Sequence, residues 1–186
     1  KILAIYEGTN GIQSMDLAMR KLLMNPEMFN FTVFKKRIAA ACEKAKGIVD
    51  DKYIAAVKEA VDKMDAAVQT LAGWRDSKKI LDILAIATPL QQAMRMIAHA
   101  WMHLWSMTVA VPKLKGIAGD IEGEKVAAVV KDNAEAAFYY GKILSNKFYL
   151  STELRHLYGY LEYITGGDPA AVNECFEEVF TGALPQ

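Results

Sequence analysis

The chain has 186 residues and carries 22 lysines and arginines against 22 aspartates and glutamates, so its formal net charge is zero. A chain without excess charge has no overall field that would attract nucleic acid or an anionic membrane surface, so we expect neither as a partner. Just over half of the residues (53%) are hydrophobic. No uncharged apolar run reaches the roughly 18 residues that a membrane span requires, so no membrane span is expected.

The first predicted helix covers residues 9–24. Ile12, Met15 and Met19 follow one another at helical spacing, and Thr9 stands where a side chain can cap the first free N–H groups. Residue 25 precedes a proline. The residue before a proline disfavours the helical conformation, so the helix is expected to end there.

Two further helices are predicted over residues 31–46 and 51–73. Gly47 is the expected C-cap of the first, because glycine adopts the left-handed conformation at little cost. The negative charges of Asp50 and Asp51 favour the start of the second. The second helix carries a long apolar stripe at helical spacing, formed by Tyr53, Ala56, Val57, Ala60, Val61, Met64, Val68 and Leu71.

Gly73 is the expected end of that helix, and a fourth helix is predicted over residues 77–111 with Ser77 as its cap. Pro89 lies inside this fourth helix and is expected to kink or break it, because proline lacks the backbone N–H. Residues 112–123 contain one proline and three glycines. They are predicted to form a loop.

The last part of the chain is predicted to hold helices over residues 124–147, 151–164 and 170–180. A Gly-Gly-Asp-Pro sequence at residues 166–169 separates the last two, and its proline stands where the final helix would start. Helices of such lengths with short connections favour antiparallel neighbours. The predicted fold class is therefore all-α, an antiparallel bundle of four to six helices.

The boundary between two units is expected near Asn25 and Pro26. Residues 1–25 then form an N-terminal unit with the first helix, and residues 26–186 form the helical bundle domain.

His99 and His103 lie one helical turn apart, a spacing at which two imidazoles can share a metal ion. Ala100 stands where a zinc protease would have its glutamate, and no other carboxylate or cysteine lies nearby in the sequence. We therefore favour packing or capping for both histidines and predict no metal site.

Methionine and aromatic side chains are concentrated in the second half of the chain. A methionine-rich helix face can bind partners, but core packing is the favoured interpretation for Met94, Met96, Trp101, Met102, Trp105 and Met107. The later aromatic residues are too dense for one core stripe. Some of them are expected to face a subunit partner or another domain: Phe138, Tyr139, Tyr140, Phe148, Tyr149, Tyr158, Tyr160 and Tyr163.

Cys42 and Cys175 lie far apart without a CxxC pattern, which indicates reduced packing cysteines.

The most informative pattern is the sequence Ile-Tyr-Glu-Gly-Thr-Asn-Gly-Ile-Gln at residues 5–13. A short apolar run ends at Tyr6, and Glu7 and Gly8 directly precede the first predicted helix. Gly8 permits a backbone conformation or a close approach that a side chain would obstruct. On these residues alone, the simpler role for Glu7 is a negative charge that favours a helix N-terminus, with no chemistry.

This pattern resembles the signature of the acyl-CoA dehydrogenase family, of which acyl-CoA oxidases and related flavoproteins carry variants. The positions that match are Tyr6, Glu7, Gly8, Thr9, Ile12 and Gln13, followed by Arg20 and Lys21 in the same helix. The motif-level resemblance covers residues 1–25. The length and helical content of the remainder resemble the larger members with an added C-terminal helical domain, such as the methylmercaptopropionyl-CoA dehydrogenase type.

The resemblance implies that Glu7 is the catalytic base of the intact protein. It would remove the α-proton of an acyl-CoA thioester while the β-hydrogen leaves as hydride to the flavin, which forms a 2,3-double bond. The α-proton is weakly acidic, so the base needs a raised pKa, which burial against flavin and acyl chain supplies. The backbone N–H of Glu7 would hold the thioester carbonyl. By the same resemblance Tyr6 and Gly8 would contact the substrate, and Thr9, Asn10 and Gln13 would contact FAD.

The resemblance also implies what surrounds the chain. The family builds its FAD and acyl-CoA site from an N-terminal helical domain, a middle β-domain and a C-terminal helical domain. The chain begins at Lys1 without a methionine, so we expect a fragment that is inactive without its upstream catalytic domains. The implied electron acceptor is an electron-transfer flavoprotein and the implied assembly a homo-oligomer. The implied compartment is the bacterial cytoplasm, or the mitochondrial matrix in a eukaryote.

Three alternatives stay open at this point. The bundle is either part of a catalytic unit or a non-catalytic domain that covers the flavin site or joins subunits. The parent is a dehydrogenase or an oxidase, because oxygen access depends on the whole site. A related flavoprotein without dehydrogenase activity is the third, and Glu7 argues mildly against it.

Overall fold

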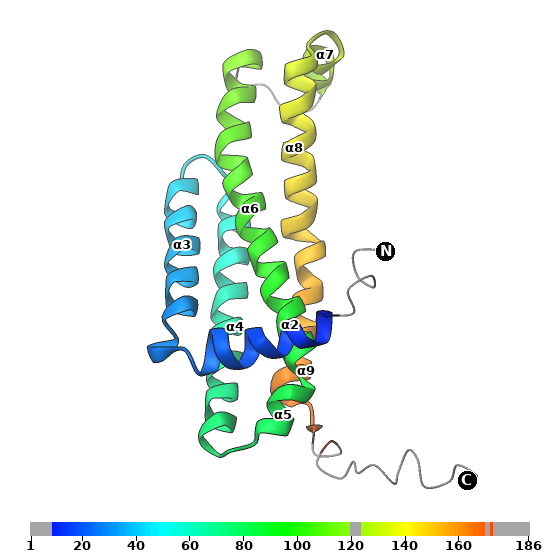
Figure 1. Cartoon of the computed structure of the whole chain (residues 1–186). Helices are drawn as coiled ribbons and strands as arrows, with labels where there is room; N and C mark the ends of the chain where they lie inside the picture. Colours follow the sequence, from blue (N-terminus) through cyan, green and yellow to red (C-terminus); the bar gives the residue numbers. More distant parts are fainter. Residues whose placement is uncertain (1–8, 120–123, 170–171, 173–186) are drawn as a thin grey trace, which may run out of the picture.

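The computed structural model describes residues 9–119, 124–169 and 172. Within these ranges every regular element is helical and no strand is present. Figure 1 shows an elongated bundle of long helices with one shorter helix laid across it. The predicted all-α bundle is therefore confirmed. No helix in the described ranges is long and apolar enough to cross a membrane.

Four long stretches of helix run up and down the bundle in chain order, each antiparallel to the one before it (Figure 1). The last stretch is almost continuous, because only a short 3-10 turn separates α8 from α9. The stretches are α3 (Phe29–Ala45), α4 (Asp51–Asp76), α6 (Ala87–Ala118), and α8 (Ala134–Ser151) with η3 (Glu153–Arg155) and α9 (His156–Gly166). α6 packs against all of the others, and most extensively against α8.

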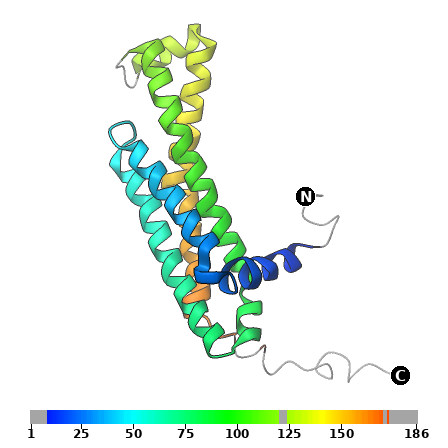
Figure 2. The ribbon, with the colours of Figure 1, turned by 60° about the vertical axis from the view of Figure 1, so that its left-hand side comes forward.

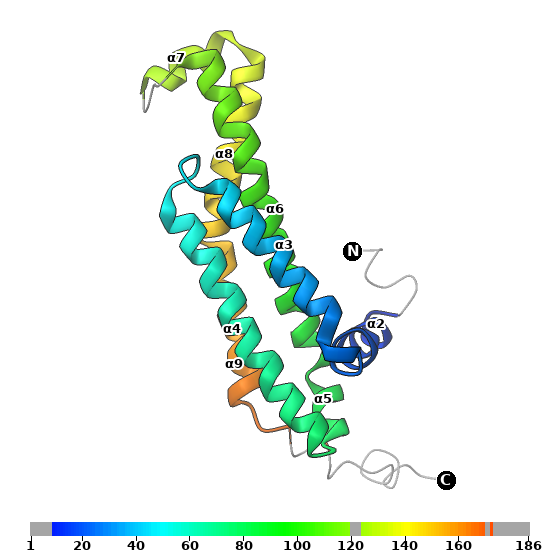
Figure 3. The same ribbon diagram turned by 90° about the vertical axis from the view of Figure 1, so that its left-hand side faces the viewer.

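Shorter helical elements connect these stretches or precede them. α5 (Ile80–Ala85) leads from α4 into α6, and α7 (Glu124–Asp132) precedes α8 at the opposite end of the bundle (Figures 1 and 3). A single 3-10 turn, η2 (Pro26–Met28), stands before α3.

The first helix of the described chain begins as α2 (Asn10–Asp16) and continues as the π-helical η1 (Leu17–Leu23). The wider winding is visible at its end, where the N–H of Met24 donates to the carbonyl of Met19 over 2.7 Å. This helix crosses the bundle rather than running along it (Figures 1 and 2). The predicted first helix and its end before Pro26 are confirmed.

The crossing helix contributes to the same hydrophobic core as the bundle. Ala18, Leu22 and Leu23 are almost completely buried, and they belong to one cluster with residues of α3, α4, α6 and α9. Its inner face is therefore a part of the folded bundle.

Two helix ends follow their local sequence signals. Asp50 caps α4, and its Oδ1 accepts a hydrogen bond of 3.0 Å from the N–H of Lys52. Gly47 follows α3 with φ of +72°, the left-handed conformation that glycine adopts without strain. The predicted start of α4 is confirmed, whereas α3 ends at Ala45 with Lys46 as its C-cap, one residue before the predicted cap at Gly47.

The predicted end of α4 at Gly73 and the capping role of Ser77 are wrong. α4 continues to Asp76, and Ser77 follows its C-terminus without capping the next helix. The extra turn is held by tertiary contacts, because Trp74 packs against the core. Arg75 also donates from Nη1 to the carbonyl of Leu23 over 2.6 Å.

Pro89 does not break its helix. The break between α5 and α6 lies at Ile86, and Pro89 is the third residue of α6. The N–H groups of a first helical turn have no partner inside the helix, so a proline there removes no hydrogen bond.

The loop predicted over residues 112–123 is wrong for its first part, because α6 continues through Pro112 to Ala118. Pro112 is exposed, while Ala110 is buried and Val111 packs against the core. Packing of these neighbours offsets the hydrogen bond that the proline removes. The helix ends before Gly119, whose φ is +74°.

The helix predicted over residues 124–147 is divided at Asn133. The Oδ1 of Asn133 accepts a hydrogen bond of 3.0 Å from the N–H of Ala136 and caps α8. α8 then runs to Ser151, beyond its predicted end. The helix predicted over residues 170–180 lies almost wholly outside the described residues.

Candidate functional site

The described part of the candidate site is the N-terminal end of α2. Thr9, Asn10 and Gln13 lie there, whereas Tyr6, Glu7 and Gly8 lie outside the described residues. Thr9 occupies the N-cap position, and its carbonyl accepts a hydrogen bond of 2.8 Å from the N–H of Gln13. The predicted position of Thr9 is confirmed, but its side chain makes no capping hydrogen bond.

The outer side of α2 presents polar and apolar side chains to solvent. Asn10 and Gln13 are exposed and lie one helical turn apart, so they share one side of the helix. Ile12 is 62% exposed beside them. A single exposed apolar side chain is common on protein surfaces, so Ile12 by itself assigns no ligand to this side of α2.

The inner side of α2 is fixed to the bundle by Ser14, which is 1% exposed. Its Oγ donates to the carbonyl of Gly11 over 2.7 Å and shares a hydrogen bond of 3.1 Å with the Oγ1 of Thr88, in the first turn of α6. This contact sets how the motif end of α2 sits on α6. Ser14 is not among the site residues that the sequence predicts. The sequence does contain one indication that Ser14 faces the bundle. Ser14 and the buried Ala18 are four residues apart, so they lie on the same face of the helix.

Arg20, which belongs to the matched motif, has a partner within its own helix. Its Nε lies 2.6 Å from Oδ1 of Asp16, and the Arg20 side chain is 70% exposed. The hydrogen bond from Arg20 lowers the pKa of Asp16 below its ordinary value, against an opposing effect of burial. An exposed ion pair of this kind contributes little stability, so Arg20 stays accessible for a contact outside the described residues.

A second polar cluster joins α6 to α8. The Nδ1 of His103 lies 2.7 Å from Oδ1 of Asn146, whose Nδ2 donates to Oγ of Ser106 over 3.0 Å. An amide oxygen can only accept, so Nδ1 of His103 carries a proton. The imidazole also stacks on Tyr149, with ring centroids 4.3 Å apart.

The two histidines therefore pack, as predicted. His99 meets Tyr149 edge to face, with centroids 6.0 Å apart. Burial holds the pKa of His99 below its ordinary value, and the positive charges of Arg95 and His103 act in the same direction. The described ranges contain no group of three or more side chains placed to hold a metal ion.

The methionine and tryptophan residues of α6 divide between core and surface. Met96 and Met107 are buried, as the core interpretation predicts, but Trp105 is 53% exposed and Met102 is 42% exposed. Some of the later aromatic residues are exposed, and the subunit partner or domain expected to cover them stays a prediction. The most exposed of them are Phe138, Phe148 and Tyr163. Cys42 is buried, which raises the pKa of its thiol.

The described residues thus define an all-α bundle domain with a motif-bearing helix anchored across it. The sequence model of the family described as "Acetyl-CoA dehydrogenase C-terminal like" matches residues 34–173, and the chain belongs to this family. The match begins after the motif helix. It therefore rests on residues other than those that carry the motif resemblance.

Two curated relatives are both named "Butyryl-CoA dehydrogenase" and come from Syntrophomonas wolfei subsp. wolfei (strain DSM 2245B / Goettingen). One is 29% identical over 187 residues, which cover 96% of this chain and 27% of that protein. The other is 26% identical over 182 residues, which cover 93% of this chain and 26% of that protein. The chain thus spans about a quarter of the length of these relatives. No solved structure matches it.

Proposed function

We propose that the chain is the C-terminal part of an FAD-dependent acyl-CoA dehydrogenase that forms a 2,3-double bond in an acyl-CoA thioester. One observation carries the proposal: the family match over residues 34–173 and the dehydrogenase-like motif at residues 6–13 occur in order in the same chain. The motif and the family match lie on different residues, and both indicate the same family. The fragment alone is proposed to be inactive.

The anchoring of α2 supports a role for the motif. Ser14, Leu22 and Leu23 fix the inner side of the crossing helix to the bundle. The start of α2 is therefore held in a defined place, with its outer side open. The bundle would thus act as a rigid base that positions the motif against the upstream domains.

The described motif residues suit one side of an FAD site. The amides of Asn10 and Gln13 can hydrogen-bond to flavin or ribityl heteroatoms, and exposed Ile12 offers an apolar contact. The flavin, when bound, accepts the hydride that leaves the β-carbon of the substrate. The remaining sides of the site would come from upstream domains.

Three motif residues would contact the substrate. Glu7 is proposed to remove the α-proton as the base, with its own backbone N–H holding the thioester carbonyl. Tyr6 and Gly8 are proposed to border the thioester, where a glycine allows the close approach of the acyl group.

The acyl group is proposed to be short. The relatives are named for butyryl-CoA, and the methylmercaptopropionyl-CoA dehydrogenase type suggested by the chain's length also takes a short thioester. Electron transfer to an electron-transfer flavoprotein and assembly as a homo-oligomer are further parts of the proposal.

Flavin reduction in the intact parent tests the proposal. Acyl-CoA esters, including butyryl-CoA and methylmercaptopropionyl-CoA, are added without oxygen while the visible flavin absorbance is followed. We expect at least one ester to bleach the flavin and expect Glu7→Gln to slow the bleaching by about 10²-fold or more, because the base is lost. Gln13→Ala is expected to weaken FAD retention.

A flavin that no acyl-CoA reduces would reject the dehydrogenase proposal. Bleaching at the parent's rate in Glu7→Gln would reject Glu7 as the base while leaving the family assignment intact.

A further inference from the structure

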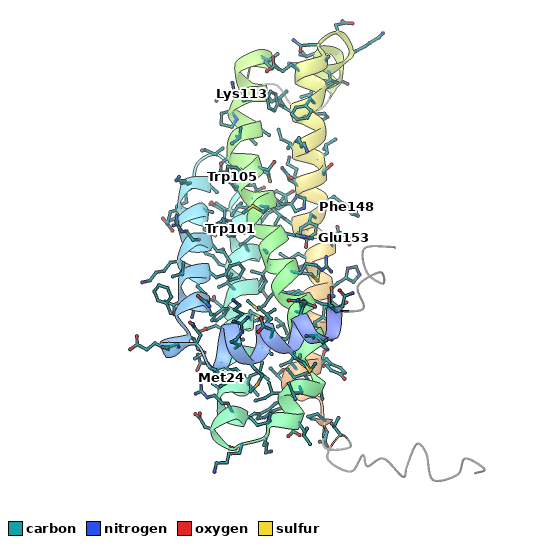
Figure 4. All side chains as sticks on the ribbon, viewed as in Figure 1. Met24, Trp101, Trp105, Lys113, Phe148 and Glu153 are labelled. Carbon is teal, nitrogen blue, oxygen red and sulfur yellow. The ribbon has the colours of Figure 1, made fainter. Side chains whose placement is uncertain are left out.

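Two apolar pockets adjoin at Trp105 on α6, and together we call them the Trp105 groove. One cavity of about 350 Å³ lies between α3 and α6, and a second of about 220 Å³ lies between α6 and α8, with Trp105 lining both. Figure 4 shows Trp101 and Trp105 on this part of α6. The apolar residues that define the groove are Trp101, Met102, Trp105, Val109 and Phe138.

The groove is apolar at its floor but remains open to solvent. Trp105, Val109 and Phe138 are each about half exposed, at 53%, 48% and 58%. Trp101 is held from below by an edge-to-face contact with Phe34, with centroids 6.0 Å apart. Neighbouring large apolar side chains of this kind are typical of a surface that binds a partner.

The charges around the groove are all positive. Arg37, Lys44 and Lys142 line it, and no carboxylate does. The sequence of α6 contains no aspartate or glutamate over its 32 residues. Glu43, the only carboxylate of α3, pairs instead with Lys46 and Lys58, 2.5 and 3.7 Å away. A chain with zero net charge thus presents a locally cationic groove, and the complementary occupant is apolar and acidic.

The chain itself contains a sequence with this complementary character. Val172, Cys175, Phe176, Val179 and Phe180 recur at helical spacing and would form one apolar stripe. Glu174, Glu177 and Glu178 are interspersed with them, and residues 170–186 contain no lysine or arginine. An amphipathic helix of this composition presents apolar anchors flanked by negative charge.

The lengths of the groove and of this sequence agree. Trp101 and Val109 are eight residues apart along α6, which corresponds to about 12 Å of helix. Val172 and Phe180 are also eight residues apart and would span the same length.

A helix formed by residues 172–180 cannot reach the Trp105 groove of its own chain. α9 ends beside α5, at the end of the bundle where α6 begins (Figures 1 and 3). Trp105 lies 18 residues beyond Ala87, or about 27 Å along α6. Residues 167–169 lie at this same end of the bundle (Figure 1). Counted from residue 169, an extended chain to residue 172 and a helix over residues 172–180 together span only about 22 Å, so a second copy of the chain must supply the groove.

We propose that residues 172–180 of one copy bind as an amphipathic helix in the Trp105 groove of a second copy. The glutamates pair with Arg37, Lys44 and Lys142 at the rim, and the apolar stripe covers Trp105. An exchange in both directions gives a closed two-fold dimer. The proposal concerns this chain alone and does not depend on the reaction of the parent.

Disulfide trapping in the full 186-residue chain tests the contact. Met102→Cys places a thiol in the groove, and Cys175 supplies the second thiol, while Cys42 is 1% exposed and protected. Mild oxidation is expected to join residues 102 and 175 between two copies, as identified by peptide mass spectrometry. Leu144→Cys is the matched control, because Leu144 is 48% exposed on α8 but does not line the groove.

Charge exchange gives an independent readout. Replacing Glu174, Glu177 and Glu178 by lysine is expected to weaken the dimer by about tenfold or more, measured by analytical ultracentrifugation. Replacing the three groove cations by glutamate is expected to do the same. Combining both sets is expected to restore the dimer, with circular dichroism showing that each variant is folded.

Three outcomes would overturn the proposal. They are equal trapping at positions 102 and 144, a 102–175 disulfide within one copy, and a dimer that is absent or that the charge exchanges leave unchanged.

Discussion

At the scale of single residues, Asn146 shows how one polar side chain fixes the contact between two helices. It is 3% exposed, and its amide uses both ends, with one end bonded to His103 and the other to Ser106. A buried amide with both ends satisfied permits one register of α8 against α6, because a shifted register leaves polar groups unpaired. No buried side-chain nitrogen or oxygen lacks a partner in the described residues.

We predict that Asn146→Ala lowers the free energy of unfolding by about 1–3 kcal/mol. The substitution leaves Nδ1 of His103 and Oγ of Ser106, both partly buried, without their partner. Urea denaturation measures the change. Ser145→Ala is the control, because Ser145 is exposed on the same helix. Equal effects of the two substitutions would show that the cluster carries no stability.

His99 makes stability depend on pH in a direction that its surroundings determine. Burial and the charges of Arg95 and His103 lower its pKa in the folded chain, while in the unfolded chain it stays near 6.5. As pH falls through about 6.5, the unfolded chain binds a proton that the folded chain resists, so stability is complete above this pH and decreases below it. Tyr149 is the neighbouring titratable group from α8.

We therefore predict that His99→Gln reduces the loss of stability between about pH 6.5 and pH 5. Urea denaturation at several pH values measures this slope. The effect is expected to be small because the imidazole is partly open to solvent. A steeper slope in His99→Gln would mean that the folded chain favours the protonated imidazole.

At the scale of helices, local signals and tertiary packing compete, and the two prolines of α6 show which one prevails. Pro89 lies in the first turn, where it removes no hydrogen bond. Pro112 lies in the interior, where the N–H of another residue would donate to the carbonyl four residues before it. The sequence pattern predicts a helix break at both prolines. The position of each proline within the helix decides how much it destabilises the helix.

We predict that Pro112→Ala raises the free energy of unfolding by about 1–2 kcal/mol. The alanine restores one helical hydrogen bond, and the greater freedom of the unfolded chain offsets part of this gain. Urea denaturation measures it. Pro89→Ala is the matched control and is expected to give no gain, because no hydrogen bond is restored there. A gain in both variants would contradict this account.

At the scale of the whole molecule, α6 is the central element of the bundle. It packs against the crossing helix and against every other long stretch, and Ala100, Leu104 and Leu90 on it are 0% exposed. The position of the motif on α2 depends on this packing, because Ser14 contacts Thr88 at the start of α6.

We predict that Leu104→Ala destabilises the fold by about 2–5 kcal/mol, because it opens a cavity where α6 meets its neighbours. Leu144→Ala is expected to change stability by less than about 0.5 kcal/mol, because Leu144 is 48% exposed. Denaturant unfolding of both variants compares them. If both substitutions lowered the free energy of unfolding by similar amounts, Leu104 would not belong to the core of the bundle.

Local chemistry was sufficient for the elements whose ends depend on neighbouring residues. The all-α class, the start of α4 at Asp50 and the end of α3 before Gly47 follow from caps, propensity and apolar spacing. The motif at residues 6–13 was visible because it is a pattern of particular residues at fixed positions in the sequence. Roles for Glu7 and its neighbours remain predictions.

Contacts between distant segments decided the rest. Packing of Trp74 and Val111 extends α4 past Gly73 and α6 past Pro112, and the partners of His103 and Ser14 lie more than 40 residues away in the chain. Such contacts leave no local pattern, since each partner is an ordinary residue of its own helix. The sequence by itself determines the all-helical class, the helix ends that local caps fix, and the pattern of the motif at residues 6–13. Only the tertiary structure determines where helices end under packing and which side chains remain exposed.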